Sequence, residues 1–574
     1  MNYKRMFFSV IVVLGLAGTN QAWAFRPANL EANPFIGGTY DPAGKIPPVT
    51  YPAFLNSPGE SLDFSYYDFQ ANGSMSRQIV IDNAGGLHVA YMKSPNNTHT
   101  PRNVAYQFND RTGGGWSGEL DMNTIQAGYV TLATMSDGRA VGAFQQSGGP
   151  VVAIDAARGA GVFTITPLDT GPLWPHVAVG PTNVIHVVAH HPTRSENYYC
   201  RSTNQGASFT PWAPITGDTM QNPISADVIT SRISGKVAVA WTRMRPGGSH
   251  VQMDMDVVYI ESTDHGATWG SMVNVTNYQS ADTVRAYNDV SGIYDQNDNL
   301  HLVWAGHLVT GGNIYTASAI FHWSQATGID NVSGPGTISG TFWWSVPANP
   351  GTWSLCATRP SLSIDATGRL FCVFSSQRNA DDSSAGGFIN MDLYGNASAD
   401  GGNTWSPTFN ITNSHTPGGA AGACDDDRFP SLTAFTTDSV RVLWIVDRDA
   451  GNSLKGEGET TLNPIHYWAS RNIVGVEAHD VPNLAMPGSF ELGPSHPNPA
   501  KGVAEFTYAL PGPREVDVAV YNVQGQLVKR LVSGFKTPGY HTAQWDASGV
   551  PAGVYLYRLN AGEFTKTRSM VVVR

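Results

Sequence analysis

Charged residues are scarce in this chain of 574 residues, since Asp, Glu, Lys and Arg together make up only 14% of it. Four cysteines are too few for a disulfide scaffold in a chain of this size, and no Cys-x-x-Cys pair suggests zinc. After residue 24, no apolar run approaches the ~20 residues that a membrane-spanning helix needs. The net charge of -11 disfavours nucleic acid as a partner.

Glycine and proline are abundant, with 61 and 36 residues. Together with the low charge, they suit many short strands joined by turns, and they argue against long helices and against disorder. The chain is also too long for one ordinary domain unless that domain is built by repetition. The composition therefore predicts an all-β protein with internal repeats.

The first 62 residues read as two segments that precede the repeats. Lys4 and Arg5, an apolar core over residues 7–16 and the small-x-small site Ala22-Trp23-Ala24 predict a signal peptide over residues 1–24. Residues 25–62 are rich in proline and glycine, and we expect an extended lead-in on the surface of the next domain.

One turn motif, Ser-x-Asp-x-Gly-x-x-Trp, recurs between strand-like stretches. Asp and Gly supply turn chemistry, β-prone residues lead in, and a large aromatic residue closes the far side. A softer copy spans residues 202–209, and a worn copy begins at Asn109. The motif residues of the two full copies are Ser262, Asp264, Gly266 and Trp269, and Ser398, Asp400, Gly402 and Trp405.

A second repeat precedes these turns: a short strand, a polar turn and an alternating apolar strand. It occurs seven times, at residues 78–91, 130–144, 176–189, 224–241, 290–304, 361–374 and 431–444. Each copy can be completed to four strands, and such sheets must stack around an axis to bury both faces. Residues 63–474 therefore predict a seven-bladed β-propeller, with six blades as the alternative because the second and fifth copies lack a convincing turn motif.

The turn motif resembles the Asp box, and this region is similar to the BNR/Asp-box, sialidase-like β-propellers. Sialidases of that family use three arginines, a tyrosine nucleophile helped by a glutamate, and an aspartate acid/base. Here no Arg-Ile-Pro motif opens the first repeat, where Arg77 lies in Ser76-Arg77-Gln78. The resemblance therefore implies the fold and leaves the activity open.

The pattern changes after Val474: residues 475–489 read as a linker and residues 490–574 as a small immunoglobulin-like sandwich. Pro497-Asn498-Pro499, the hairpin at residues 521–528 and the stretch 553–559 resemble the type A C-terminal sorting domain of type IX secretion substrates. The resemblance implies secretion or surface display by a Gram-negative cell, with the outer-membrane secretion machinery as partner. A plain structural sandwich is the alternative.

The repeat places the turn motifs at one end of the ring and the channel mouth, where the inner strands begin, at the other. A concave mouth with mixed charge and aromatic residues is the expected ligand site. Ends of second strands add further polar residues, among them His190 and Asp447. The predicted mouth residues are Arg77, Tyr129, His176, Asn222, Tyr287, Asp289, Arg359 and Arg428.

Two arginines at the mouth, Arg359 before Pro360-Ser361 and Arg428 before Phe429-Pro430-Ser431, occupy matching places in neighbouring repeats. They predict a bidentate clamp on one anionic group. The alternative is that each arginine pairs with a nearby carboxylate, for example within Asp425–Asp427.

Cysteine and metal candidates are few. Cys356 and Cys424 precede the two arginines in equivalent loops, which predicts a disulfide between neighbouring blades, whereas Cys200 and Cys372 read as buried thiols. No cofactor or metal is expected, apart from Asp425–Asp427 as a candidate for calcium.

The sequence thus predicts a secreted propeller that binds a glycan or a surface protein at its mouth. A glycoside hydrolase or lyase using the same mouth, and a structural adhesion component, are the alternatives.

Overall fold

The computed structural model describes residues 57–573 apart from gaps at 76, 218, 220–223, 225, 249–251, 311–312, 334–348, 378–381, 437–438, 471–489, 497, 511–513, 537–538 and 563. The predicted signal peptide, most of the lead-in and the linker at 475–489 lie outside these residues. Among the residues described, the only helix is the 3-10 turn η1 (Ser453–Lys455). The chain divides into two compact units, Met1–Gly475 and Val476–Arg574.

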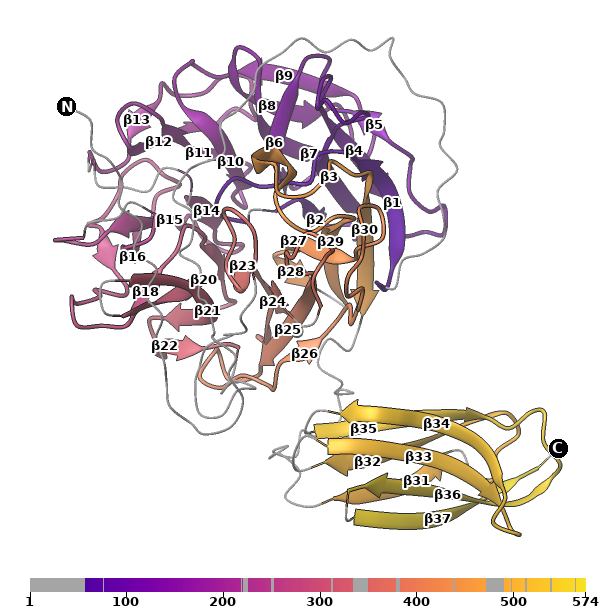
Figure 1. Cartoon of the computed structure of the whole chain (residues 1–574). Helices are drawn as coiled ribbons and strands as arrows, with labels where there is room; N and C mark the ends of the chain where they lie inside the picture. The colour runs from indigo at the N-terminus through magenta and orange to yellow at the C-terminus, as the bar shows by residue number, and fades with distance from the viewer. Residues whose placement is uncertain are drawn as a thin grey trace. The chain divides into compact units, whose positions relative to one another are not determined.

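In the first unit, the repeats fold as antiparallel sheets arranged around a common centre (Figure 1). Three sheets have four strands each, in chain order from the centre outwards. These strands are β2 (Ile79–Ile81), β3 (Leu87–Lys93), β4 (Asn103–Asn109) and β5 (Leu120–Asp121), then β6 (Ala127–Thr134), β7 (Ala140–Gln146), β8 (Gly149–Asp155) and β9 (Phe163–Pro167), then β10 (Leu173–Val179), β11 (Ile185–His191), β12 (Glu196–Ser202) and β13 (Ala213–Pro214).

The next two groups merge into one nine-stranded sheet because β18 (Val284–Ala286) pairs with a strand of each. The first group is β14 (Asp227–Thr230), β15 (Val237–Met244), β16 (Met255–Ser262) and β17 (Val273–Asn274), and the second is β19 (Ser291–Tyr294), β20 (Leu300–Thr310), β21 (Asn313–Ser324) and β22 (Gly328–Asn331).

The following sheet has a fifth strand, β28 (Phe435–Thr436), which runs parallel to its inner strand. Its other strands are β23 (Ala357–Asp365), β24 (Leu370–Gln377), β25 (Met391–Ser398) and β26 (Phe409–Asn410). The last sheet consists of β27 (Asp426–Leu432), β29 (Val440–Asp447), β30 (Asn463–Ser470) and β1 (Glu60–Ser65).

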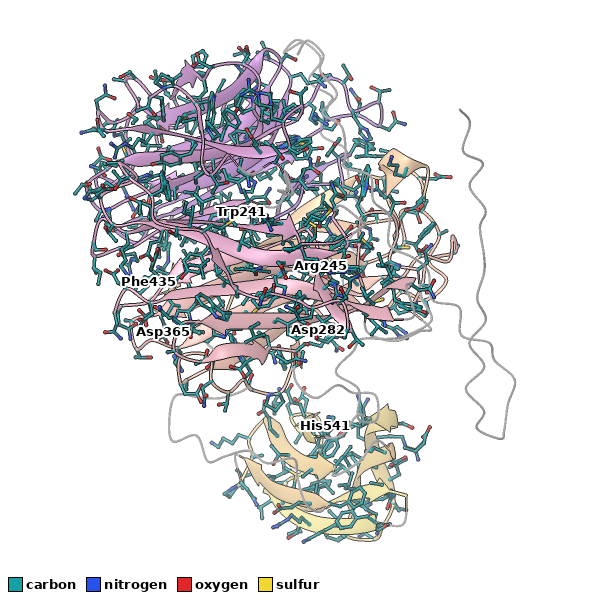
Figure 2. All side chains as sticks on the ribbon, turned by 90° about the vertical axis from the view of Figure 1, so that its left-hand side faces the viewer. Trp241, Arg245, Asp282, Asp365, Phe435 and His541 are labelled. Carbon is teal, nitrogen blue, oxygen red and sulfur yellow. The ribbon has the colours of Figure 1, made fainter. Side chains whose placement is uncertain are left out.

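The second strands of the sheets are apolar over most of their length because neighbouring sheets cover both of their faces. Trp241, Trp304 and Trp444 occupy the same position on β15, β20 and β29, and all three are fully buried. In the side view of Figure 2, Asp365, at the end of an inner strand, lies to the left of Trp241, and Arg245, just after a second strand, lies to its right. These two residues mark opposite ends of the ring.

Strand β1 closes the ring and includes residues 60–62, the last three of the predicted lead-in. It pairs antiparallel with β30, from Glu60 opposite Tyr467 to Ser65 opposite Asn463. The carboxylate of Asp63 also accepts hydrogen bonds from first-sheet residues Tyr91 and Lys93, both at 2.8 Å. The sequence pattern missed this strand because it stands alone, about 400 residues before its partner.

The connector, residues 66–78 between β1 and β2, crosses the channel mouth from one side of the ring to the other. The Tyr67 hydroxyl lies 2.9 Å from that of Tyr129, and the Val290 amide donates to Ser74 Oγ at 2.9 Å. These contacts reach two different sheets, and the indigo connector can be followed across the centre in Figure 1. The concave mouth predicted from sequence is therefore largely filled by the chain itself.

Side-chain oxygens on inner strands join neighbouring sheets around the channel. In each case a side-chain oxygen on one inner strand accepts a hydrogen bond from a backbone N–H at the next inner strand. The four pairs are Thr131 with Val177, Asp227 with Gly292, Ser361 with Leu432, and Ser431 with Gln78, at 2.8–3.2 Å. Such bonds fix the register of one sheet against the next.

Hydrogen bonds within each of the two full turn motifs fix the conformation of the loop. Ser262 Oγ donates to Asp264 at 2.8 Å and accepts from the Gly266 amide at 2.9 Å, while the Thr268 amide donates to Asp264 at 2.8 Å. Ser398, Asp400, Gly402 and Thr404 repeat this pattern. Trp269 packs edge-on against Tyr199 and Trp405 against His322, each on the preceding sheet. The motifs therefore act as contacts between sheets.

Replacing Gly402 with alanine should destabilise the first unit by roughly 2 kcal/mol more than the same change at Gly401. Both glycines have positive φ, +90° and +70°, so each alanine carries a backbone cost of about 1 kcal/mol. A Cβ on Gly402 would lie 2.0 Å from the His322 ring, whereas one on Gly401 meets nothing within 4 Å. Denaturant unfolding of the two variants tests this, and equal losses would contradict it.

The predicted disulfide is wrong in this structure, where Cys356 and Cys424 are both free and buried. Cys356 Sγ lies 3.8 Å from Thr316 Oγ1, and Cys424 Sγ lies 3.3 Å from the Gly419 carbonyl. Each thiol therefore contacts residues near it and not the other cysteine. Cys200 and Cys372 are buried free thiols, as the sequence predicted.

The second unit contains two sheets that share one apolar core, with Phe506, Val518, Trp545 and Tyr557 contributed by both. The three-stranded sheet is β31 (Glu491–His496), β32 (Val503–Leu510) and β35 (Gly539–Asp546). The four-stranded sheet is β34 (Leu527–Lys536), β33 (Arg514–Asn522), β36 (Gly553–Ala561) and β37 (Phe564–Val572).

Candidate functional site

A pocket at the channel mouth brings together residues from the connector and from the last two sheets. It has about 280 Å³ of empty space, including its opening to solvent. The connector supplies Asp68 and Phe69, and the loops before β23 and after β29 supply the small polar residues. The lining residues are Asp68, Phe69, Thr352, Ser354, Arg359, Arg428, Phe429, Asp447, Gly451 and Asn452.

Two of these residues owe their positions to β-bulges. The pairing of β23 with β24 shifts between Thr358 and Ser361, and the pairing of β27 with β29 shifts between Arg428 and Ser431. Arg359 and Phe429 sit in these bulges with φ of 53° and 57°. Strands β6 and β10 carry the same bulge, with Tyr129 and Trp174 at positive φ, so the bulge belongs to the repeat and re-aims side chains towards the mouth.

The strand pairing corrects the prediction that the two arginines occupy matching places. Arg359 matches Phe429, and Arg428 matches Thr358, because the bulges lie at equivalent positions before Ser361 and Ser431 while Arg428 stands one residue farther from its serine. The two guanidinium groups therefore start from different positions on their strands.

Arg359 is buried against two aromatic rings that also contact each other. Its guanidinium carbon lies 4.2 Å from the centre of the Phe429 ring and 5.0 Å from that of Phe69. Its amide donates to Asp289 Oδ2 at 2.8 Å, and Nη2 donates to the Trp353 carbonyl at 3.3 Å. Burial lowers the pKa of Arg359 to about 10, against the attraction of Asp289. Its Nε has no partner among the described residues.

Arg428 is already paired, which is the alternative that the sequence left open. Its Nε donates to both oxygens of Asp426 at 2.7 Å, and Nη1 donates to Ser354 Oγ at 2.9 Å. The predicted clamp of two free guanidinium groups on one anion is therefore not what the pocket offers.

Two buried carboxyl groups, Asp68 and Asp447, line the same pocket. Burial raises the pKa of Asp447 well above its usual range, and the charges of Asp68 and Asp426 add to this effect. Burial also raises the pKa of Asp68, against a hydrogen bond from the Ser453 amide at 3.2 Å. Like charges in one buried site favour retention of a proton. The pocket thus holds a carboxylic acid available to donate.

The other predicted mouth residues do not line this pocket, although Asp289 accepts from the Arg359 amide and Tyr287 interacts electrostatically with Arg359. Arg77 enters the channel, where it bonds to three sheets. Tyr129 and His176 are buried on β6 and β10, and burial lowers the pKa of His176 to about 4. Tyr287 packs edge-on against His307. Asn222 lies outside the described residues.

Sequence reasoning missed Asp68, Phe69 and Asn452. The first two belong to the connector, which has no counterpart in the other repeats, so no alignment of repeats places them. Asn452 caps η1 by accepting from the Leu454 amide at 3.2 Å, and an Asn before Ser-Leu-Lys is the local signal that was available.

The three carboxylates suggested for calcium do not converge on one point. Asp425 pairs with Arg448, Asp426 pairs with Arg428, and Asp427 accepts from Trp444 Nε1 at 2.7 Å. Successive residues of a strand alternate in direction, which explains their separation. Across the part of the chain that the structure describes, no group of three or more His, Cys, Asp and Glu side chains could hold a metal ion.

Replacing Asp447 with asparagine should stabilise the protein at pH 7 by more than about 1.4 kcal/mol, the worth of one unit of pKa shift. The unfolded carboxyl ionises near pH 4, while the folded one stays protonated to higher pH, so wild-type stability falls as pH rises above 4. Asparagine can still accept from the Asp449 amide. The gain should vanish near pH 3.5, as measured by denaturant unfolding across pH.

Exposed Asp110 provides the control, because the amide and hydroxyl of Thr112 lower its pKa. Asp110→Asn should therefore bring no stabilisation at pH 7. A loss of stability in Asp447→Asn at pH 7 would show that the buried carboxyl is ionised.

Solved structures similar to this chain have low identity to it. An ulvan lyase from polysaccharide lyase family PL25 is 10% identical, with a TM-score of 0.46 over 70% of this chain and 99% of that chain. PorZ, a surface component of the type IX secretion system of Porphyromonas gingivalis, is 12% identical, with a TM-score of 0.39 over 88% and 60%. The Hadza microbial sialidase Hz136 is 15% identical, with a TM-score of 0.32 over 72% and 68%.

No curated protein matches the chain. Among the described residues, no helix is long and apolar enough to cross a membrane. Residues 495–573 match the model of the secretion system C-terminal sorting domain. This match confirms the resemblance stated for the C-terminal part, and it indicates that the chain is a protein exported by a secretion system.

Proposed function

We propose that this chain is an exported seven-bladed propeller that binds a glycan in the pocket of Asp68, Arg359 and Asp447. The seven inner strands β2, β6, β10, β14, β19, β23 and β27 support the blade number, and β1 is the outer strand of the seventh blade. The sorting domain supports delivery to the surface or exterior of a Gram-negative cell by a type IX secretion system.

The observation that carries the binding proposal is the mixture of groups in one pocket. Ligand sites are concave, with a few polar groups that fix orientation. Here carboxyl and guanidinium groups are held beside Phe69 and Phe429, and the strained bulge at Arg359 directs its side chain to this place. Carboxyl and guanidinium groups together accept from and donate to hydroxyl groups, which are the dominant groups of sugars.

A glycoside hydrolase is the second candidate, favoured by the Asp68 and Asp447 pair. Two carboxyl groups with different proton affinities are the usual acid and base of glycoside hydrolysis. The lining residues include neither tyrosine nor glutamate, so the sialidase arrangement is disfavoured.

Binding of the purified chain to a panel of neutral and acidic oligosaccharides, measured by calorimetry, tests the proposal. The Asp447→Asn variant should bind at least about tenfold more weakly, a loss of ~1.4 kcal/mol. The control variant Arg139→Ala changes an exposed turn that contributes nothing to the pocket. Binding without release of new reducing ends supports a binding module, whereas release that Asp447→Asn abolishes supports the hydrolase. Absence of binding to every sugar would refute the proposal.

A further inference from the structure

Two polar atoms of residues that line the pocket are buried without a partner among the described residues. They are Asp68 Oδ1 and Arg359 Nε, on side chains of residues that are only 6% and 5% exposed. A buried polar group left unpaired costs about 1–3 kcal/mol, so such groups call for a bound water or ligand. One of these atoms accepts and the other donates, so a single group could satisfy both.

The pocket is too narrow for a sugar ring. Although its empty space is about 280 Å³ with the opening included, it has room for about one water molecule. Phe69 and Phe429 pack against each other and against the Arg359 guanidinium. A ligand can therefore insert one small group while the rest of it stays outside.

Charges around the pocket argue against an anionic group. The guanidinium of Arg428 is neutralised by Asp426, and Arg359 has Asp289 behind it. Asp68 and Asp447 add carboxyl groups and no further cation to the lining. The pocket has no excess positive charge to attract an anion. An ammonium group would be repelled by the guanidinium of Arg359, whose Nε–H can only donate a hydrogen bond.

We propose that the pocket takes one uncharged hydroxyl group of a neutral sugar, which donates to Asp68 Oδ1 and accepts from Arg359 Nε. A hydroxyl has one donor and two lone pairs, so it can make both bonds at once. This inference rests on the proposed glycan-binding function and gives its ligand class.

Calorimetry with the full-length exported chain tests the inference. The probes are the methyl glycosides of glucose, galactose, mannose and xylose, compared with methyl glucuronoside and the methyl glycoside of sialic acid. For the neutral sugar that binds, a series of monodeoxy analogues follows. We expect loss of one hydroxyl to weaken binding at least tenfold and loss of the others to change it less than threefold.

The variant Arg359→Lys removes the Nε donor, so its affinity for the parent sugar should be at least tenfold lower than that of the unmodified protein. The analogue that lacks the critical hydroxyl should bind the variant and the unmodified protein with equal affinity. The deoxy series uses the unmodified protein, so it remains decisive if the variant does not fold. Tighter binding of the acidic sugars, or an equal loss of affinity for every deoxy analogue, would overturn the inference. Neither result would contradict the proposed glycan-binding function. Absence of binding to all six glycosides and to the oligosaccharide panel would overturn both.

Discussion

A chain that starts at residue 66 should lose on the order of 5 kcal/mol or more of stability relative to one that starts at residue 57. The shorter chain lacks β1, whose backbone pairs with β30 from Glu60 to Ser65. Each hydrogen bond contributes about 1 kcal/mol net, and the loss also exposes the edge of β30. Thermal unfolding of the two truncated chains, compared at equal concentration, measures the difference.

The effect should exceed that of losing one strand pairing because β1 also holds the first sheet. Besides the bonds from Tyr91 and Lys93 to Asp63, Gln107 Nε2 donates to the Leu62 carbonyl at 3.0 Å, and Trp116 Nε1 donates to Glu60 at 2.9 Å. Ser57 Oγ further donates to Asp427 at 2.9 Å in the last sheet. These contacts tie the first sheet to the last.

A double change, Asp63→Asn with Trp116→Phe, separates the two contributions. The double variant of the chain that starts at residue 57 keeps β1 but weakens its bonds to the first sheet. Its stability should therefore lie between those of the unmodified chains that start at residues 57 and 66. Equal stability of the chains starting at 57 and 66 would show that β1 does not close the ring.

The strands were predictable because their pattern is local. The alternation that ends at Trp241 recurs at Trp304 and Trp444, and each of these tryptophans is buried where the repeat requires it. The turn motifs were equally visible because Ser262, Asp264 and Gly266 bond within eight residues of one another. Local periodicity thus accounted for the sheets and their turns.

The site was less predictable because it depends on contacts that no repeat carries. Arg359 and Arg428 were recognised, but they stand one position apart on their strands, and Arg428 is paired with Asp426 whereas Arg359 Nε has no partner among the described residues. Asp68 reaches the pocket only because the connector crosses the mouth, and that path follows from the pairing of β1 with β30. Ring closure therefore creates part of the site.

Replacing Arg77 with methionine should cost about 2–4 kcal/mol of unfolding free energy. Predicted from sequence as a ligand residue, this side chain instead lies in the channel. Its Nη1 donates to the Leu432 carbonyl at 3.1 Å and Ser361 Oγ at 3.3 Å, and Nη2 donates to the Gly292 carbonyl at 3.1 Å. Burial lowers its pKa to about 10, against the attraction of Asp227, so it remains charged at pH 7.

Methionine fills similar space without donors, so the carbonyls of Gly292 and Leu432 lose their bonds at the centre of the ring. Lysine keeps the charge but not the planar fork, so Arg77→Lys should lose less than Arg77→Met. The control Arg139→Met breaks an exposed ion pair with Asp137 and an exposed hydrogen bond to Gln205, and should change stability by less than about 1 kcal/mol. Denaturant unfolding ranks the three variants. If Arg77→Met retained wild-type stability but lost glycan binding, Arg77 would be a ligand residue after all.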